Sequence, residues 1–327
     1  MGILVTGSAG FIGFHVVKQL LEQGFSVVGI DSLSDYYEVK LKIDRNNILK
    51  GFSGYDFSQV DICDLEGLAQ IFKHRKIDKI CHLAAQPGVR YSIQNPFAYQ
   101  KANNEGFLNV IECTRHYGVK QFVYASSSSV YGGNKKLPFS EIDTVDAPVS
   151  LYAATKKSNE LVAHVYKHLY GINAIGLRFF TVYGPWGRPD MAYFAFTRAI
   201  LADKPIKVYN HGNMKRDFTY VNDIVGGVLA ALEYSGQCEI FNLGNDRTVS
   251  LEDFIAYLEK YLGRQAIKQM LPIQPGDIPE TWADIDSAKK ELGYQPKTDI
   301  KQGLELFVNW FKNDYMNLNA QLQGAKS

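Results

Sequence analysis

The sequence predicts an α/β protein: a doubly wound parallel sheet of Rossmann type, followed by a smaller α/β C-terminal domain. Short β-branched runs alternate with longer helical patterns through residues 1–180, which is typical of repeated βαβ units covered by helices on both faces. A glycine-rich stretch, TGSAGFIG, stands between the first strand and the first helix, where such a fold receives a dinucleotide. After residue 180 the alternation fades into Gly- and Pro-rich segments around a smaller unit.

The expected elements follow from these patterns. The strands are β-branched runs bounded by turn residues, at 3–6, 26–31, 55–61, 79–84, 121–126 and 172–179. The helices between them have apolar residues at helical spacing, at 11–23, 64–74, 97–117 and 151–170. Asp64 is the expected N-cap of the second helix, and Gly24 and Gly118 follow the first and third as stops.

The later part of the chain carries two further helix signals. Ser250 and Asp253 form a capping pattern for a helix that runs to about 262, and a last helix covers 301–314. We therefore expect a Rossmann domain over 1–180, a substrate domain over 181–318 with segments that return to the first, and a polar tail over 319–327.

Composition excludes several classes of partner. The 327 residues carry 35 Lys and Arg against 34 Asp and Glu, a formal charge of +1, so no global field attracts nucleic acid or an anionic membrane. No stretch approaches the ~18 apolar residues that a membrane helix needs, and the chain passes from Met1 directly into a predicted strand without a signal-peptide pattern. We expect a cytoplasmic protein that binds neither nucleic acid nor membrane.

Cysteine and histidine spacing predicts no metal site. The cysteines form no CxxC pair and are expected as buried free thiols: Cys63, Cys81, Cys113 and Cys238. His164 and His168 are four apart on a predicted helix, but no third ligand accompanies them.

The glycine loop and the acids after it indicate a nucleotide cofactor. Glycines there allow a tight turn and close approach of the backbone to a pyrophosphate, although a purely structural turn is the alternative for the glycines alone. Asp31 ends the second strand, where an acid binds an adenosine ribose and repels a 2′-phosphate, so NAD is favoured over NADP; a surface-turn role is the alternative. The predicted cofactor-binding residues of the loop and strand ends are Gly7, Gly10, Phe11, Ile12, Gly13, Asp31, Asp61, Ile62 and Ala84.

A tyrosine and a lysine indicate proton chemistry. Tyr152 and Lys156 are four apart on a predicted helix and therefore share a face. A lysine about 4 Å from a phenolate contributes roughly 4 kcal/mol at an effective dielectric near 20, about three pK units, as an upper bound that desolvation reduces. The serine run 126–129 ends the fifth strand, where ligands of open parallel sheets bind. A solvated helix face is the alternative.

Five motifs together resemble one superfamily: TGSAGFIG, HLAA at 82–85, SSSSVYG at 126–132, YAATK at 152–156 and RDFTYVND at 216–223. The chain resembles extended short-chain dehydrogenases/reductases of the NAD-dependent epimerase/dehydratase family over roughly residues 2–315. This resemblance implies a Rossmann fold, bound NAD and a nucleoside-diphosphate-sugar substrate. By its match to the family, Ser127 is the catalytic serine beside Tyr152 and Lys156, and all three are predicted catalytic residues.

The motifs also favour one branch of the family. Ser128 and Ser129 stand where sugar 4,6-dehydratases carry Asp-Glu and where UDP-glucuronate decarboxylases carry a Glu, and hydroxyls cannot shuttle protons as an acid does. The segment RFFTVYGPWGRPDMA, with Thr181, resembles the UDP-glucuronate 4-epimerase branch. The expected activity is therefore NAD-dependent 4-epimerisation of UDP-glucuronate to UDP-galacturonate through a 4-keto sugar. The alternatives are a UDP-glucose or UDP-N-acetylhexosamine 4-epimerase, a decarboxylase, and a non-catalytic NAD-binding sensor.

The predicted substrate site combines hydroxyl donors with cations. A uronate needs a carboxylate pocket, and a diphosphate needs an arginine, for which the RDF match singles out Arg216. The predicted substrate-binding residues are Arg90, Ser128, Ser129, Thr181, Arg188, Tyr209 (against the base), Arg216 and Asp277, with a solvated-surface role as the alternative for Arg90 and Asp277. The helices at 97–117 and 151–170 are expected to pair across a twofold axis in a homodimer.

Overall fold

The computed structural model describes residues 1–317, so the predicted tail 319–327 lies outside the described residues. Its centre is a seven-stranded sheet in the order β10-β6-β5-β4-β1-β2-β3, and every neighbouring pair is parallel. The strands are β1 Gly2–Thr6, β2 Ser26–Asp31, β3 Tyr55–Gln59, β4 Lys79–His82, β5 Gln121–Ser127, β6 Asn173–Phe179 and β10 Ile240–Leu243. The strand order reverses between β1 and β4, which is where open α/β sheets bind ligands.

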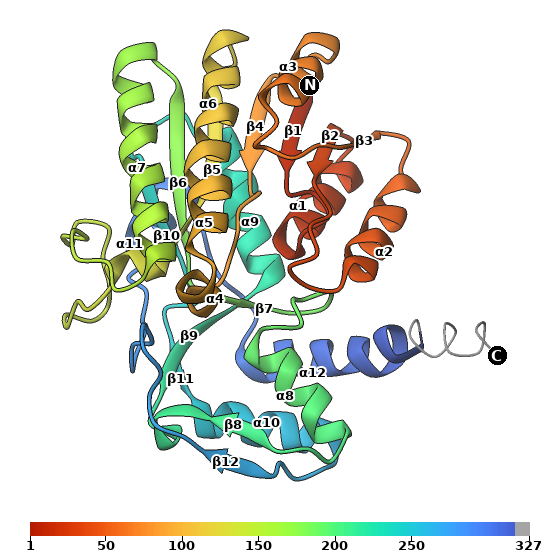
Figure 1. The fold of residues 1–327 in the computed structure, drawn as a ribbon, viewed down its shortest axis with the longest axis vertical. Coiled ribbons are helices and arrows are strands. Elements are labelled where there is room, and N and C mark those ends of the chain that lie inside the picture. The colour runs from red at the N-terminus through yellow and green to blue at the C-terminus, as the bar shows by residue number, and fades with distance from the viewer. Residues whose placement is uncertain (318–327) are drawn as a thin grey trace.

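Helices cover both faces of this sheet (Figure 1). Alternation along β1 sends Ile3 and Val5 into one apolar core and Leu4 into the other. The first core is shared with α1 Phe11–Glu22, α2 Val39–Lys50 and α9 Val221–Glu233. The second is shared with α3 Leu65–His74, α6 Gly106–His116 and α7 Leu151–Tyr170. The predicted doubly wound α/β fold is therefore confirmed.

The predicted elements of the first part are present with small shifts at their ends. The Asp64 side chain accepts from Gly67 N, and Ser250 accepts from Asp253 N, so both predicted N-caps are confirmed. The helix expected at 97–117 divides into α5 Pro96–Tyr99, a π-helical stretch Gln100–Glu105 and α6. The sequence analysis missed α2 and α4 Val89–Gln94. In α2, VKLKIDRNNILK, charged and amide side chains interrupt the apolar stripe that marks a helix.

The remaining segments form a smaller unit beyond the carboxyl ends of the strands (Figure 1). Its sheets are β11-β9-β7 and β12-β8, built from β7 Thr181–Tyr183, β8 Ile206–Val208, β9 Lys215–Tyr220, β11 Thr248–Ser250 and β12 Lys268–Met270. Its helices are α8 Ala192–Leu201, α10 Leu251–Leu262 and α12 Ile300–Trp310. Three segments of this later part return to the large sheet: β10, α9 and α11 Asp286–Leu292. The boundary at 180 remains a prediction.

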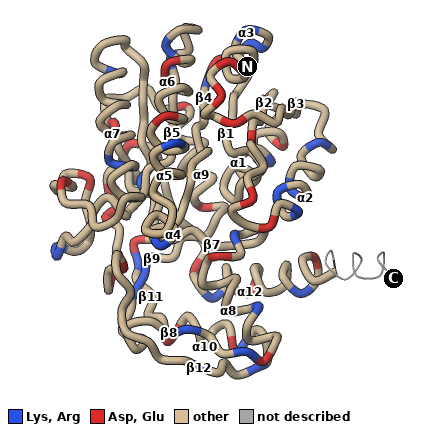
Figure 2. Tube along the Cα trace, viewed as in Figure 1, with Lys and Arg blue, Asp and Glu red and all other residues tan. Residues whose placement is uncertain are grey.

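Basic and acidic residues are interspersed along the chain trace (Figure 2), in keeping with the formal charge of +1. None of the helices within residues 1–317 has the length and apolar character needed to cross a membrane. All four cysteines are free, as expected, but only Cys81 and Cys113 are buried. Cys63 and Cys238 are half-buried because each lies in a loop at the end of an element.

Candidate active site

The glycine loop closes tightly on itself between β1 and α1. Gly7 has a φ of +71°, and a Cβ built on it would lie 2.8 Å from Ala84 N. A Cβ on Gly13 would lie 2.0 Å from Gly7 O, and one on Gly10 would lie 2.9 Å from the same oxygen. Glycine is therefore required at Gly7 and Gly13 by contact distance. The loop places the first turn of α1, with its unpaired backbone N–H groups, against the adjoining cavity, and this cradle fits a diphosphate.

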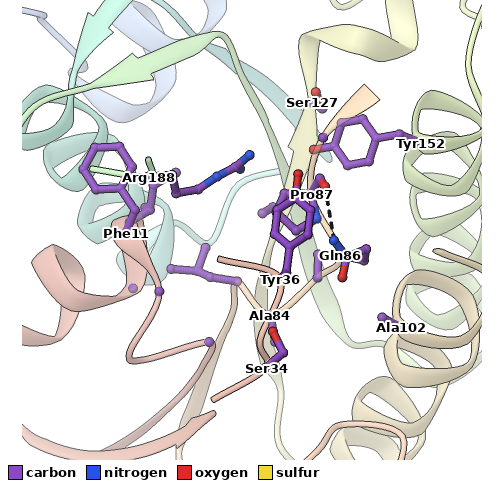
Figure 3. Close-up of a pocket in the computed structure, with 18 of the residues that line it drawn as sticks. Phe11, Ser34, Tyr36, Ala84, Gln86, Pro87, Ala102, Ser127, Tyr152 and Arg188 are labelled. Carbon is purple, nitrogen blue, oxygen red and sulfur yellow. Dashed lines mark hydrogen bonds between the residues drawn. The ribbon is translucent and has the colours of Figure 1, made fainter. Parts of the chain in front are cut away.

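A cavity of about 590 Å³ runs from the ends of β2 and β3 across the glycine loop to β5 and α7. Figure 3 shows side chains from several walls of this cavity, with Phe11 at the left, Ser34 at the bottom, and Ser127 and Tyr152 at the upper right. The structure brings every predicted cofactor-binding residue to its wall: Gly7, Gly10, Phe11, Ile12, Gly13, Asp31, Asp61, Ile62, Ala84, Tyr152 and Lys156.

Asp31 places an acidic group at the β2 end of the cavity. Its Oδ2 accepts from Ala9 N at 3.1 Å and its Oδ1 from Leu33 N at 2.8 Å. Burial raises the pKa of Asp31, whereas these backbone N–H groups and the charge of Lys42 act in the opposite direction. A carboxylate fixed here accepts from ribose hydroxyls and repels a 2′-phosphate, which fits NAD.

The predicted catalytic residues meet at the other end. Ser150 caps α7 by accepting from Ala153 N at 3.1 Å, which sets Tyr152 in the first turn of the helix. The hydroxyl of Tyr152 is turned toward Ser127 (Figure 3), and Ser127 acts to lower the pKa of this phenol. Lys156, one turn later, donates from Nζ to Ala125 O at 2.8 Å.

Lys156 is not among the groups that shift the pKa of the Tyr152 phenol in this arrangement. Burial raises the pKa of Tyr152, and the two groups that oppose this rise are the Ser127 hydroxyl and the charged Arg188. The Lys156 ammonium is instead held by the carbonyl of Ala125. Burial also lowers the pKa of Lys156 to about 8.

Arg188 extends from the side of Phe11 toward Ser127 and Tyr152 (Figure 3) and lines the cavity. Asp190 holds it through two contacts, Nε to Oδ1 at 3.0 Å and Nη2 to Oδ2 at 2.6 Å. Tyr36 donates to the same carboxylate at 3.2 Å. The guanidinium has five donors, so donors remain for a ligand in the cavity.

A second cavity of about 140 Å³ adjoins the first. Ser128, Ser129 and Thr181 line both cavities, and Arg216 and Asp277 line the second. The hydroxyls predicted to bind a uronate therefore lie between the phenol end of the first cavity and the predicted phosphate ligand.

Arg90 and Tyr209 lie beside the second cavity and do not belong to the lining recorded for either cavity within residues 1–317. Arg90 forms an ion pair with Asp277, Nη2 to Oδ2 at 2.9 Å, and its guanidinium lies over the Tyr209 ring at 4.6 Å. The structure thus brings Arg90, Asp277 and Tyr209 together, but the predicted stacking of Tyr209 against a base has no cavity wall to support it.

The segment after β2 contributes lining residues that the sequence analysis missed: Ser32, Ser34, Tyr36, Tyr37 and Lys42. Lys42 donates from Nζ to Ser34 O at 2.7 Å and to Ser34 Oγ at 2.9 Å. The polar and aromatic run that directly follows Asp31 could have indicated these lining residues. It was overlooked because helix α2, which follows it, was not predicted.

The fold and this cavity define a dinucleotide-binding protein of Rossmann type, with a serine, a tyrosine and a lysine where β5 meets α7. A model of the NAD dependent epimerase/dehydratase family matches residues 3–244. The chain belongs to this family.

Individual relatives and solved structures are similar to this chain over most of its length. UDP-glucuronate 4-epimerase 4 of Arabidopsis thaliana is 47% identical over 331 residues, which cover 96% of this chain and 76% of that protein. UDP-glucuronic acid 4-epimerase from Bacillus cereus, crystallised with UDP-glucuronic acid and NAD, is 39% identical with a TM-score of 0.89, covering 95% of this chain and 99% of the other. UDP-glucose 4-epimerase from Thermotoga maritima, crystallised with UDP-glucose, is 32% identical with a TM-score of 0.87, covering 96% and 100%.

Proposed function

We propose that this protein is an NAD-dependent isomerase that inverts C4 of UDP-glucuronate to give UDP-galacturonate. The observation that carries this proposal is the run of hydroxyls, Ser128, Ser129 and Thr181, on the wall shared by the two cavities. Hydroxyls there bind a carboxylate without offering a side-chain acid for further proton transfer. The 47% identity to a UDP-glucuronate 4-epimerase supports the same substrate.

In the proposed reaction Tyr152 accepts the proton of the sugar 4-hydroxyl, and Ser127 hydrogen-bonds the same oxygen. NAD held by the glycine loop and Asp31 would supply hydride transfer at C4, and its positive charge would favour the phenolate of Tyr152. Lys156, held at Ala125 O, adds positive charge to this end of the cavity. Arg216 binds the diphosphate, so the sugar turns about its link to the anchored nucleotide and presents the opposite face of C4.

Oxidation at C4 makes the sugar a β-keto acid, which tends to lose carbon dioxide. The three hydroxyls and Arg188 would hold the carboxylate away from the geometry in which its carbon–carbon bond breaks. This accounts for hydroxyls at positions where the decarboxylases of the family carry a Glu.

Incubating the protein and NAD with UDP-glucuronate tests this proposal. We expect UDP-galacturonate as the product, identified by chromatography and NMR. UDP-xylose as the only product would make the protein a decarboxylase. Faster conversion of UDP-glucose or of a UDP-N-acetylhexosamine, run in parallel, would make it a neutral-sugar 4-epimerase, and no conversion of any sugar would favour a sensor.

We further propose a homodimer formed by α5, α6 and α7. These helices carry exposed apolar side chains, of which Phe97 is 82% exposed, Leu169 60% and Leu161 57%. A cluster of this kind on neighbouring helices is typical of a protein interface. A twofold axis would pair each helix with its copy.

Replacing Leu161 by Asp should therefore give a monomer, because a charge would be buried in the interface. Size-exclusion chromatography with light scattering checks the mass, with Glu252→Gln on α10 as the control that should leave a dimer. A wild-type monomer at micromolar concentration would overturn the homodimer. The cytoplasmic location remains a prediction. We expect the product to serve as a precursor of surface polysaccharide.

A further inference from the structure

A buried ion pair lies directly behind the predicted catalytic residues. Arg178 on β6 donates to Glu160 on α7 through two contacts, Nε to Oε1 at 2.8 Å and Nη2 to Oε2 at 2.9 Å. The side chains are 3% and 4% exposed. A buried ion pair of this kind is weak evidence for stability, because desolvation offsets the attraction between the charges. The position of this ion pair beside the predicted catalytic residues is therefore more informative about its role than its contribution to stability.

Glu160 belongs to the face of α7 that meets β5. Tyr152, Lys156 and Glu160 are spaced by four along this helix and so lie on one face. The hydroxyl of Tyr152 is turned toward Ser127 (Figure 3), and Lys156 donates to Ala125 O. Glu160 completes the set, because Ser126 Oγ donates to its Oε1 at 2.7 Å. Three consecutive residues at the end of β5 thus face three successive turns of α7, and hydrogen bonds join the second and third of these turns to the strand.

Arg178 is itself held from a third side. Its Nη1 donates to the Tyr131 hydroxyl at 3.0 Å, and its guanidinium lies over the Tyr131 ring at 4.9 Å. The Tyr131 hydroxyl donates to Asn242 Oδ1 on β10 at 2.6 Å. The position of Glu160 is therefore fixed by β5, β6 and β10 together.

The charge of Glu160 also acts on Lys156. Burial lowers the pKa of Lys156, and the negative charge of Glu160 acts in the opposite direction. Glu160 thus favours the ammonium form at the cavity end where Tyr152 lies.

We propose that Glu160 is a positioning residue, whose carboxylate, clamped by Arg178, fixes Lys156 and the first turns of α7 against the end of β5. The effect on turnover rests on the function proposed above, whereas the effect on Lys156 does not. Lys156 lines the cavity that fits NAD, so a displaced ammonium would change both the rate and the binding of the dinucleotide.

Glu160→Gln tests the proposal, since it keeps the shape of the side chain and removes its charge. We expect kcat on UDP-glucuronate to fall by about 10²-fold with KM little changed, as a small misplacement near the reacting atoms produces. We also expect the dissociation constant for NAD to rise about tenfold, measured by calorimetry on protein stripped of nucleotide. Glu112→Gln is the matched control. Glu112 accepts from Arg115 at 2.7 Å and from the hydroxyl of Tyr166, which lies near the other end of α7. This substitution should leave kcat and the affinity for NAD unchanged.

A double variant separates positioning from stability. Glu160→Gln leaves Arg178 charged and without its carboxylate, which alone can lower the melting temperature or prevent folding. Glu160→Gln with Arg178→Met removes both charges at similar volume, and should fold with a melting temperature near that of the wild type. The proposal requires that the double variant remain slow and bind NAD weakly.

Recovery of kcat and NAD affinity in the double variant would overturn the proposal, because the pair would then serve stability alone. So would a Glu160→Gln variant with wild-type behaviour, or a Glu112→Gln variant that loses as much. A wild-type protein that converts no nucleotide sugar would refute the proposed function. The NAD affinities of the Glu160 variants would still decide the role of Glu160.

Discussion

Tyr152→Phe should lower kcat by roughly 10³-fold, about 4 kcal/mol of transition-state stabilisation, because the variant has no group to accept the proton of the 4-hydroxyl. The substitution removes one oxygen and keeps the ring, which packs edge-on against Tyr99 at 6.1 Å between centroids. Removing the hydroxyl that faces Ser127 should change the free energy of unfolding by only about 1 kcal/mol. NAD binding should therefore survive, and a steady-state assay with calorimetry checks both expectations.

The matched control is Tyr124→Phe, the same chemical change in the middle of β5. Within residues 1–317, Tyr124 is buried and lines neither of the two cavities described above. Its kcat should stay within about twofold of the wild type. If Tyr152→Phe retained wild-type activity, the phenol would not be the base, and the proposed chemistry would fail whichever sugar is the substrate.

Gly13→Ala should abolish NAD binding and lower stability by several kcal/mol. A Cβ at this position would lie 2.0 Å from Gly7 O. Because this oxygen belongs to the backbone, no side chain can move aside, and the helix and the loop must separate. The displaced loop could no longer present the first turn of α1 to a diphosphate. Thermal unfolding and a binding titration with NAD measure the two effects.

Gly226→Ala supplies the control on a helix of the same face of the sheet. Gly226 lies within α9, is exposed, and a Cβ there would meet nothing within 4 Å. Alanine has the higher helix propensity, so stability should rise by about 0.5–1 kcal/mol with NAD binding unchanged. A Gly13→Ala protein that binds NAD like the wild type would show that the loop does not act as the cradle.

The sequence predicted best where a local signal determined the structure. Helix α7 runs over the predicted residues 151–170 because Ser150 caps its start and Gly171, with a φ of +66°, ends it. The glycine loop followed from its place between a strand and a helix. These features depend on residues close together in the chain.

The missed features depend on contacts between distant segments. Lys156 points to Ala125 O, which no spacing rule encodes, and the groups that lower the pKa of Tyr152 are Ser127 and Arg188. Helix α2 lacks a clear apolar stripe, and its role in carrying Lys42 to the cavity appears only in the folded chain. Tyr209 pairs with Arg90 because the two segments meet in space.

Conversion of UDP-glucuronate in D₂O, with the product analysed by NMR and mass spectrometry, tests the central claim most directly. The hydrogen that leaves C4 is held within the site and returned to C4, whereas the proton taken by Tyr152 exchanges with solvent. The account predicts UDP-galacturonate that carries ordinary hydrogen at C4. Deuterium at C4 would show inversion by proton exchange with solvent and would contradict the account.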